Sequence, residues 1–174
     1  MQALSSGQAD LAIGVSLESA AYGGLQAKPL GQVKFVFAVA PHHPLAQLPE
    51  PLKDDVIQQH RAVAVADTVQ RGSSISFGLL IGQDVFTVAT MQAKLDAHLR
   101  GLGVGFLPEP IARTYIKAGR LVVKRVERPE RVVQPCYAWR AAAKIDHARA
   151  LQWWLTQLES PTTRAALLSN HRGV

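Results

Sequence analysis

The glycine-rich segment Gly101-Leu102-Gly103-Val104-Gly105 is the feature of the sequence that most resembles a nucleotide site. Dinucleotide-binding loops have the spacing GxGxxG and connect a strand to the helix after it, so that the helix N-terminus faces the pyrophosphate. Here the spacing is GxGxG, and the pattern predicts a helix before the glycines and a strand after them. We therefore expect no nucleotide there. The sequence GxxxxGK[ST] of P-loop ATPases does not occur.

Residues that could catalyse a reaction or bind a metal are present, but their spacing does not favour either role. His42 and His43 are adjacent, so in an extended segment their rings point to opposite sides, and we expect them to cap a loop. Cys136, the single cysteine, lies in an apolar strand pattern and is expected to pack as a small buried residue. Asp54 and Asp55 precede a predicted helix, where they complement its dipole. We predict no enzyme activity, no cofactor and no metal.

Small and hydroxyl-bearing residues follow three of the predicted strands. Open α/β sheets bind ligands beyond the carboxyl ends of parallel strands. Such residues offer backbone and side-chain hydrogen bonds to a compact polar ligand, although Asp, Thr and Ser are also common in ordinary turns. The three segments are Val15-Ser16, Ala66-Asp67-Thr68 and Ala89-Thr90-Met91.

Strand and helix signals alternate along the chain, which is typical of an α/β fold and favours mostly parallel pairing. In the strand over 103–107, we expect a helix or a ligand to approach the backbone closely at Gly103 and Gly105. Strands are predicted at 10–15, 34–40, 61–66, 85–88, 103–107, 121–126 and 132–139.

The predicted helices have clear end signals. Residues 1–7 are expected to end a helix at Gly7, and a helix over 110–118 has a proline in its first turn. A helix over 91–102 places Met91, Leu95, His98 and Leu102 on one face. Asp146 is the expected N-cap of a further helix, and the residues from 161 onward are expected to fray. The apolar stripe of that helix comprises Ala148, Leu151, Trp154, Leu155 and Leu158.

The composition is that of a globular protein, with 174 residues, 48% hydrophobic residues and a mean hydropathy of +0.05. No apolar run approaches the roughly 20 residues that a membrane span needs. Residues 1–10 also lack the pattern of a signal peptide. We therefore expect a cytoplasmic protein without membrane contact.

The net charge of +6 favours an anionic partner but does not identify one. The positive charges are scattered, apart from a concentration over 120–131 that Glu127 and Glu130 interrupt. Nucleic-acid interfaces combine basic residues with exposed aromatic residues or present a basic recognition helix, and neither pattern is found here. We interpret the segment 120–131 as a solvated basic face.

Four segments, in matching order and spacing over about residues 4 to 160, resemble one protein family. They are LSSGQADLAIG at residues 4–14, VFAVAPHHPLA at 36–46, LGVGFLP at 102–108 and GRLV at 119–122. Each segment alone is a weak signal, but the set is similar to the effector-binding domain of LysR-type transcriptional regulators.

The resemblance implies an α/β fold of the type 2 periplasmic-binding-protein kind. Two lobes, each a Rossmann-like sheet with flanking helices, would be joined by two crossover strands and hold a small effector in the cleft between them. Residues 1–36 and 135–174 would form the first lobe, without its N-terminal part, and residues 37–134 the second. The family's winged helix-turn-helix has no counterpart in the sequence, so we expect a fragment of a longer protein.

The resemblance also implies site residues and partners. The full-length protein would be a homodimer or homotetramer, would bind DNA through a domain absent from this chain, and would take a small-molecule effector without a cofactor. Val15 differs from the small polar residue that some relatives have at that position. The expected ligand-binding residues are Val15, Ser16, Ala66, Asp67, Thr68, Val88, Ala89, Thr90, Phe106 and Tyr137.

Two functional hypotheses remain open at this point. The first is the effector-sensing domain of a bacterial transcription factor, in which the ligand acts through its different affinity for two states. The second is a free-standing small-molecule binding protein or enzyme with the same fold, since fold does not determine function. The coding sequence upstream of Met1 would discriminate them, because a helix-turn-helix favours the first and a secretion signal the second.

Overall fold

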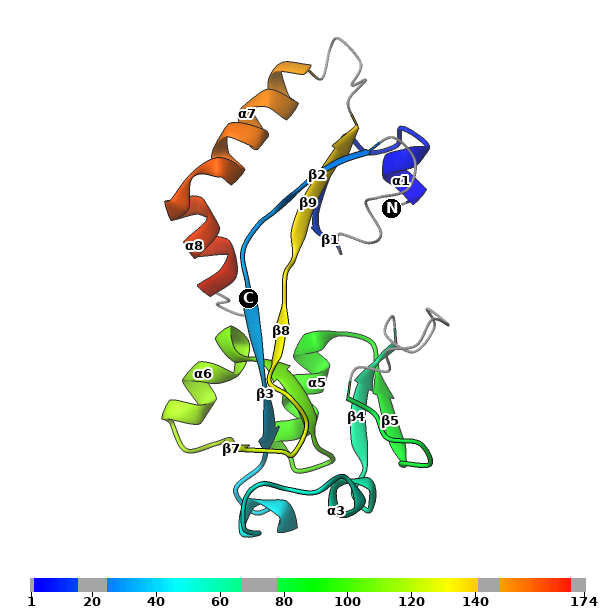
Figure 1. The fold of residues 1–174 in the computed structure, drawn as a ribbon, viewed down its shortest axis with the longest axis vertical. Coiled ribbons are helices and arrows are strands. Elements are labelled where there is room, and N and C mark those ends of the chain that lie inside the picture. The colour runs from blue at the N-terminus through cyan, green and yellow to red at the C-terminus, as the bar shows by residue number, and fades with distance from the viewer. Residues whose placement is uncertain (1, 16–24, 67–77, 141–147, 170–174) are drawn as a thin grey trace. The chain divides into compact units, whose positions relative to one another are not determined.

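The structure is a computed structural model that describes residues 2–15, 25–66, 78–140 and 148–169. The chain divides into two compact units (Figure 1). Unit 1 comprises Met1–Val33 and Val132–His171, and unit 2 comprises Lys34–Arg131 and Arg172–Val174. The chain passes from unit 1 to unit 2 within β3 (Val33–Val39) and returns within β8 (Arg131–Val133).

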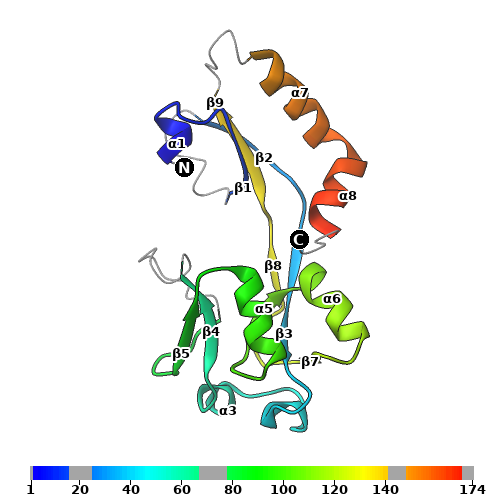
Figure 2. The ribbon, with the colours of Figure 1, turned by 180° about the vertical axis from the view of Figure 1, so that it is seen from behind.

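Unit 1 contains an antiparallel sheet in the order β1-β9-β2. Its strands are β1 (Leu11–Val15), β2 (Leu25–Pro29) and β9 (Cys136–Arg140). The helices of the unit are α1 (Gln2–Ser5), α7 (Ala148–Glu159) and α8 (Pro161–Ser169). Figures 1 and 2 show α1 and α7 on opposite sides of this sheet.

The core of unit 1 follows from the alternation of side chains along β9. Tyr137 and Trp139 lie on one face, where their rings stack at 5.7 Å and Tyr137 packs with Leu30 and Leu158. Ala138 lies on the other face and packs with Leu4 of α1. The central strand therefore contributes to both cores of the unit.

Unit 2 is built on β3, which pairs antiparallel with β6 (Gly105–Pro108) and β7 (Val122–Lys124). A second, parallel pair consists of β4 (Ala62–Val65) and β5 (Val85–Val88). A single bridge between Ala62 and Val104 connects β4 to the chain just before β6. The helices of the unit are η1 (Pro44–Ala46), α3 (Asp54–Gln58), α5 (Met91–Leu99) and α6 (Glu109–Lys117).

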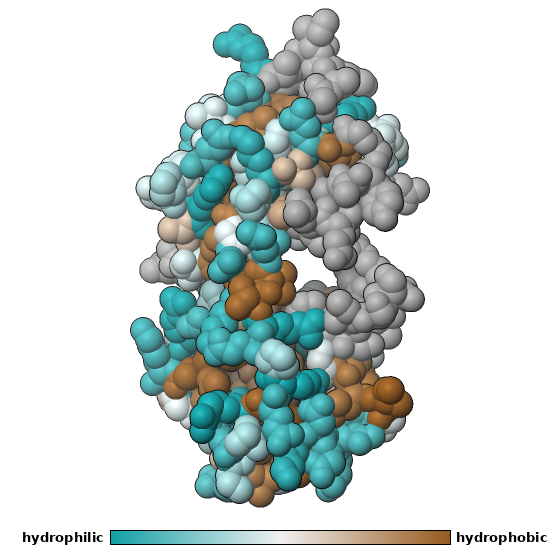
Figure 3. All heavy atoms as spheres, viewed as in Figure 1, coloured by the Kyte–Doolittle hydropathy of each residue, from teal (hydrophilic) through white to brown (hydrophobic). Residues whose placement is uncertain are grey.

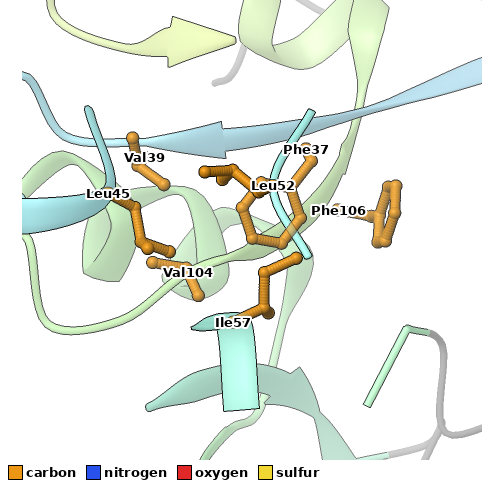
Figure 4. Close-up of a cluster of buried hydrophobic side chains, with 7 residues drawn as sticks. All are labelled: Phe37, Val39, Leu45, Leu52, Ile57, Val104 and Phe106. Carbon is orange, nitrogen blue, oxygen red and sulfur yellow. The ribbon is translucent and has the colours of Figure 1, made fainter. Parts of the chain in front are cut away.

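Side chains on the two faces of β3 form two cores. Ala38 packs with Leu95 of α5 and Ala112 of α6 on one face. Phe37 and Val39 lie on the other face, in a cluster that includes residues of η1, α3 and β6. Figure 4 shows this second cluster, with Phe106 at one end of it.

The expectation of mostly parallel pairing is wrong for the described strands. The pairs of β9 with β1 and β2, and of β3 with β6 and β7, are antiparallel, and the pair of β4 with β5 is parallel. Short apolar runs indicate a buried strand but not its direction. Here β9, from the C-terminal part of the chain, lies between two strands from the N-terminal part.

One predicted strand needs a corrected boundary, and one observed strand has no counterpart among the predictions. The strand expected over 132–139 is divided into β8 and β9, with Gln134 and Pro135 between them. A proline has no backbone N–H to donate to a ladder, which explains the interruption. The strand β2 was not expected, because its last residues are Lys28 and Pro29 and its sequence lacks a strong apolar alternation.

The helix predictions are confirmed in position but not in every detail. The helix α5 ends at Leu99, and Leu102 is 47% exposed rather than part of its buried face. Trp154, expected in the apolar stripe of α7, is 45% exposed. Residues 161–169 form α8 instead of fraying, and residues 170–174 lie outside the described residues. Asp146 lies outside the described residues.

Gly103, but not Gly105, is the position of close backbone approach. A Cβ added at Gly103 would lie 2.7 Å from the carbonyl oxygen of Arg61 and 2.8 Å from Cγ2 of Val63. At Gly105 the nearest atoms would be 3.7 Å away, which is ordinary contact, but φ there is +148°. The expectation that both glycines are tightly packed therefore holds for Gly103 alone.

Candidate functional site

The carboxyl ends of β4 and β5 lie side by side, because Val65 is paired with Val88 in the parallel register. Ala66 follows one strand, and Ala89 and Thr90 follow the other. Ala66 is half-buried, and Ala89 and Thr90 are exposed. The structure thus brings these predicted site residues to one edge of the pair. The other expected residues near this edge, Asp67 and Thr68, lie outside the described residues, as does Ser16 of unit 1.

Thr90 also has a structural role at this edge. It is the N-cap of α5, and its hydroxyl oxygen accepts a hydrogen bond of 3.1 Å from the backbone N–H of Ala93. The hydroxyl can still donate its own proton to a ligand. Thr90 therefore combines a capping function with a candidate binding function.

Phe106 and Tyr137 are both buried, in different units. Phe106 of β6 is opposite Phe37 of β3, and the two rings meet edge to face with centroids 5.4 Å apart. The Tyr137 side chain is fully buried, and its hydroxyl oxygen has no hydrogen-bond partner among the described residues. Val15 is at the end of β1, where it is paired with Cys136, the residue that precedes Tyr137 in the sequence. The role of all these residues in ligand binding stays a prediction.

Unit 2 has a cavity of about 320 Å³ beside β3. Its walls come from β3, β6, β7 and the segment after β7. The cavity has an apolar lining with several cations around it. The lining residues are Lys34, Phe35, Val36, Phe37, Phe106, Val123, Lys124, Arg125, Val126, Arg128, Pro129, Glu130 and Arg131.

Ion pairs hold several of the cations that line this cavity. Lys34 pairs with Glu130 at 2.7 Å, and Arg125 pairs with Glu50 at 2.9 Å. The ammonium of Lys124, which is buried, lies 3.5 Å from Glu50 and donates to the backbone carbonyls of Ala46 and Leu48. On the face shown in Figure 3, the surface of unit 2 is largely hydrophilic with separate hydrophobic patches.

Arg128 is a lining residue with a guanidinium nitrogen that makes no hydrogen bond to the described residues. Its Nε donates to Asp54 at 2.7 Å and its Nη1 donates to the carbonyl oxygen of Gly78 at 3.0 Å. Its Nη2 is buried without a hydrogen-bond partner in the part of the chain that the structure describes. The guanidinium carbon lies 5.9 Å from the centre of the Phe106 ring. Arg128 therefore lies near the aromatic ring of Phe106 and has one unused hydrogen-bond donor.

Arg131 adds a third guanidinium to the lining of the same cavity, after Arg125 and Arg128. Burial lowers its pKa, and the positive charge of Arg128 lowers it further. Two like charges in a partly desolvated region raise the electrostatic free energy unless an anion is near.

The sequence did not lead us to expect this cavity. The interpretation of 120–131 as a solvated basic face is wrong for Lys124, which is buried, and for Arg128, whose side chain is 24% exposed. A signal was present in the alternation of Val122, Lys124 and Val126, which places Lys124 on the apolar face of a short strand. The partners Glu50 and Asp54 are more than 70 residues away and have no sequence signal.

The residues considered for catalysis have structural roles. His43 accepts a hydrogen bond from the backbone N–H of Leu45 through Nδ1, which confirms a loop-capping role, and burial lowers its pKa to about 4. Cys136 is buried as expected, and burial raises the pKa of its thiol. Asp54 and Asp55 are in the first turn of α3. Within the described ranges, no three His, Cys, Asp or Glu residues are arranged to hold a metal ion.

The family model of the LysR substrate binding domain matches residues 1–160 of the chain. The chain belongs to this family. The resemblance in four short segments is thus confirmed over most of the chain. Among the residues that the structure describes, no helix is long and apolar enough to cross a membrane.

Transcriptional regulators are among the similar curated proteins. The chain is 40% identical over 124 residues to the HTH-type transcriptional regulator YeeY of Escherichia coli. The matched segment covers 71% of this chain and 40% of that protein. It is 32% identical over 157 residues to the probable HTH-type transcriptional regulator YhaJ of Escherichia coli, covering 89% of this chain and 51% of that protein. The chain therefore spans about half the length, or less, of these relatives.

Solved structures of LysR regulatory domains have the same fold. The regulatory domain of MetR from Neisseria meningitidis superposes with a TM-score of 0.69 at 18% identity, covering 97% of this chain and 76% of that one. The regulatory domain of HypT from Salmonella typhimurium gives a TM-score of 0.65 at 18% identity, covering 95% and 77%. The expected two-lobe α/β fold of the periplasmic-binding-protein kind is confirmed by these similarities.

Proposed function

We propose that this LysR substrate binding domain is the effector-sensing part of a bacterial transcription factor. Its ligand is a small metabolite, and ligand binding modulates DNA binding or transcription by the full-length protein. The observation that carries the proposal is the family match over residues 1–160. Relatives whose names describe HTH-type regulators support it.

In this proposal, unit 1 corresponds to the first lobe and unit 2 to the second lobe of the fold. The strand ends at Ala66, Ala89 and Thr90 contribute to effector binding from unit 2, and Val15 and Tyr137 contribute from unit 1. Exposed hydroxyl and backbone groups at the carboxyl ends of β4 and β5 support this assignment.

The wider properties of the whole protein belong to the same proposal. It binds DNA through a helix-turn-helix outside this chain, assembles as a homodimer or homotetramer, and acts in the cytoplasm. It is not an enzyme. A structure of the full-length regulator LysG from Corynebacterium glutamicum with bound effector Arg supports the proposal of an effector-binding domain within a longer regulator. It shares the fold with a TM-score of 0.61 at 18% identity, covering 90% of this chain and 53% of that one.

A thermal-shift screen of metabolites against the chain tests this proposal, followed by calorimetry of each hit. A ligand present at 100 times its Kd should stabilise the fold by about 2.7 kcal/mol. We expect at least one metabolite to bind with a fixed stoichiometry and to remain chemically unchanged in the mixture. A hit that the protein converts to another compound would contradict the proposal and favour an enzyme of the same fold.

A further inference from the structure

We propose that the cavity of unit 2 binds a small organic anion with an apolar body, with Arg128 holding the anionic group. The inference rests on the proposed function only in that both require a small-molecule ligand. It assigns a ligand chemistry and a binding residue to a cavity that is separate from the strand ends at Ala66, Ala89 and Thr90.

Arg128 has a hydrogen-bond donor that the described residues leave unused. A guanidinium has five N–H donors, and Nε and Nη1 of Arg128 already donate to Asp54 and Gly78. Nη2 is buried and lacks a partner among the described residues. An unpaired donor on a charged group is costly, whereas a charge-assisted hydrogen bond to an anion is among the stronger polar interactions.

The charges around the cavity favour an anion over a cation. Five lining residues are cationic, namely Lys34, Lys124, Arg125, Arg128 and Arg131. Glu130 is the one carboxylate among these lining residues, and Glu50 and Asp54 pair with cations of the lining. Within the lining, cations therefore outnumber carboxylates. This favours an anionic ligand over a cationic one.

The rest of the lining determines what the anion is attached to. Phe35, Phe37 and Phe106 supply aromatic surface, and Val126 supplies aliphatic surface. Inorganic anions gain nothing from such walls, because apolar contact stabilises only apolar groups. The volume of about 320 Å³ is at the lower end for ligand sites, so the ligand is small.

Phenylacetate and its neutral analogue phenylacetamide make a direct test, because they differ in charge and little in shape. We would titrate each into the ¹⁵N-labelled chain and follow the backbone amide signals of residues 123–131, apart from Pro129, by NMR. We expect phenylacetate to shift these signals and to bind about tenfold or more tightly than phenylacetamide. Raising the salt from about 50 mM to about 300 mM should weaken phenylacetate binding. Equal affinity for the two compounds would overturn the proposal.

Variants separate ligand contact from stability. Arg128→Gln should lose about tenfold or more of the phenylacetate affinity. Arg120→Gln changes a cation that lies over Tyr115 outside the cavity lining, and it should retain the parent affinity. Asp54→Asn removes the ion-pair partner of Arg128 while leaving the lining intact, so affinity should be unchanged or higher. If Asp54→Asn loses as much affinity as Arg128→Gln, the ion pair rather than the ligand contact explains the effect, and the proposal fails.

A final comparison uses inorganic phosphate and the metabolite screen. Phosphate that binds residues 123–131 as tightly as phenylacetate would contradict the apolar part of the proposal. A metabolite that shifts the signals of Val65, Ala66 and Val88–Thr90, together with no phenylacetate binding at 123–131, would refute this inference and leave the proposed function intact. Phenylacetate binding at 123–131 without any metabolite hit in the screen would support this inference and count against the proposed function.

Discussion

Nδ1 of His98 lies 3.0 Å from the carbonyl oxygen of Ala38, a contact that joins the helix α5 to the central strand β3. A carbonyl oxygen only accepts hydrogen bonds, so Nδ1 has the proton when the ring is neutral. Nε2 is then a buried lone pair without a partner among the described residues. Burial lowers the pKa of His98 to about 3, and the Lys94 ammonium contributes to the decrease.

This histidine should make the fold less stable in mild acid. Between its native pKa of about 3 and its ordinary value of 6.5, the unfolded chain binds a proton that the native state excludes. The free energy of unfolding therefore decreases as the pH falls below about 6.5. From pH 7.5 to 5.5 the decrease from this residue should be about 1.4 kcal/mol.

Urea denaturation of His98→Asn at both pH values measures this contribution. The Asn amide can still donate to Ala38 but does not titrate, so the variant should lose about 1.4 kcal/mol less than the parent over this range. Gln92→Ala, an exposed change on the same helix, should keep the parent's pH dependence. An equal pH dependence for His98→Asn and the parent would assign the effect to other groups.

Lys94 of the same helix should destabilise the fold at neutral pH. The residue is 5% exposed, and burial, followed by the charge of Arg131, lowers its pKa to about 8. At pH 7 the native state therefore holds a protonated amine in a poorly solvated place. Lys94→Met, which has a similar length, should raise the free energy of unfolding at pH 7 by about 1 to 3 kcal/mol.

The pH dependence of this gain provides a check. Between about pH 8 and 10.5 the unfolded chain keeps a proton on Lys94 that the native state releases, so the parent gains stability as the pH rises. The difference between Lys94→Met and the parent should therefore shrink over this range. Lys117→Met, a change at an exposed position of α6, should give no gain. A lower midpoint for Lys94→Met at pH 7 would contradict the prediction.

Thr90 should contribute to stability through its cap on α5. Thr90→Ala removes the oxygen that accepts from Ala93 and should cost about 1 kcal/mol in a denaturation experiment. Thr90→Ser keeps this oxygen and should retain most of the parent stability. If both variants unfold at the parent midpoint, the hydrogen bond is not formed in solution. Ligand-binding tests at Thr90 should accordingly compare Ser with Ala, because Ala alone changes both properties.

Local features of the fold could be predicted from the sequence because their signals are local. The apolar runs that became β1, β3, β4 and β5 end at glycines, prolines or polar residues. The helix α6 has Pro110 in its first turn and Gly119 after its end. In each case the covalent chemistry of one or two residues determines where the element starts or stops.

The pairing and the cavity could not be predicted, because they depend on residues that are distant in sequence. The direction of β9 relative to β1 and β2 follows from contacts across more than 100 residues. Arg128 is part of the candidate cavity because Asp54 and Gly78 hold its guanidinium. A basic residue between glutamates indicates a solvated position when the sequence is considered alone, and the buried environments of Lys94 and Lys124 likewise have no local signal.

Gly103 and Gly105 should respond differently to alanine. The Cβ of Gly103→Ala would lie 2.7 Å from the backbone carbonyl oxygen of Arg61, just before β4. A backbone atom can move away only if the segment that contains it shifts. Gly105→Ala meets no atom closer than 3.7 Å, but its φ of +148° is strained for a residue with a Cβ. We expect Gly103→Ala to lower the free energy of unfolding by about 1 to 3 kcal/mol or more through overpacking.

Gly119→Ala provides the reference for strain without contact, since φ there is +67° and nothing lies within 4 Å of an added Cβ. That variant should lose about 1 kcal/mol, the ordinary cost of a left-handed backbone for alanine. Gly105→Ala should lose a similar amount, and Gly103→Ala should lose more than either. Urea denaturation of the three variants under one condition ranks them. If Gly103→Ala is as stable as the parent, the backbone at Arg61, just before β4, can shift, and its close packing against the segment before β6 does not limit the fold.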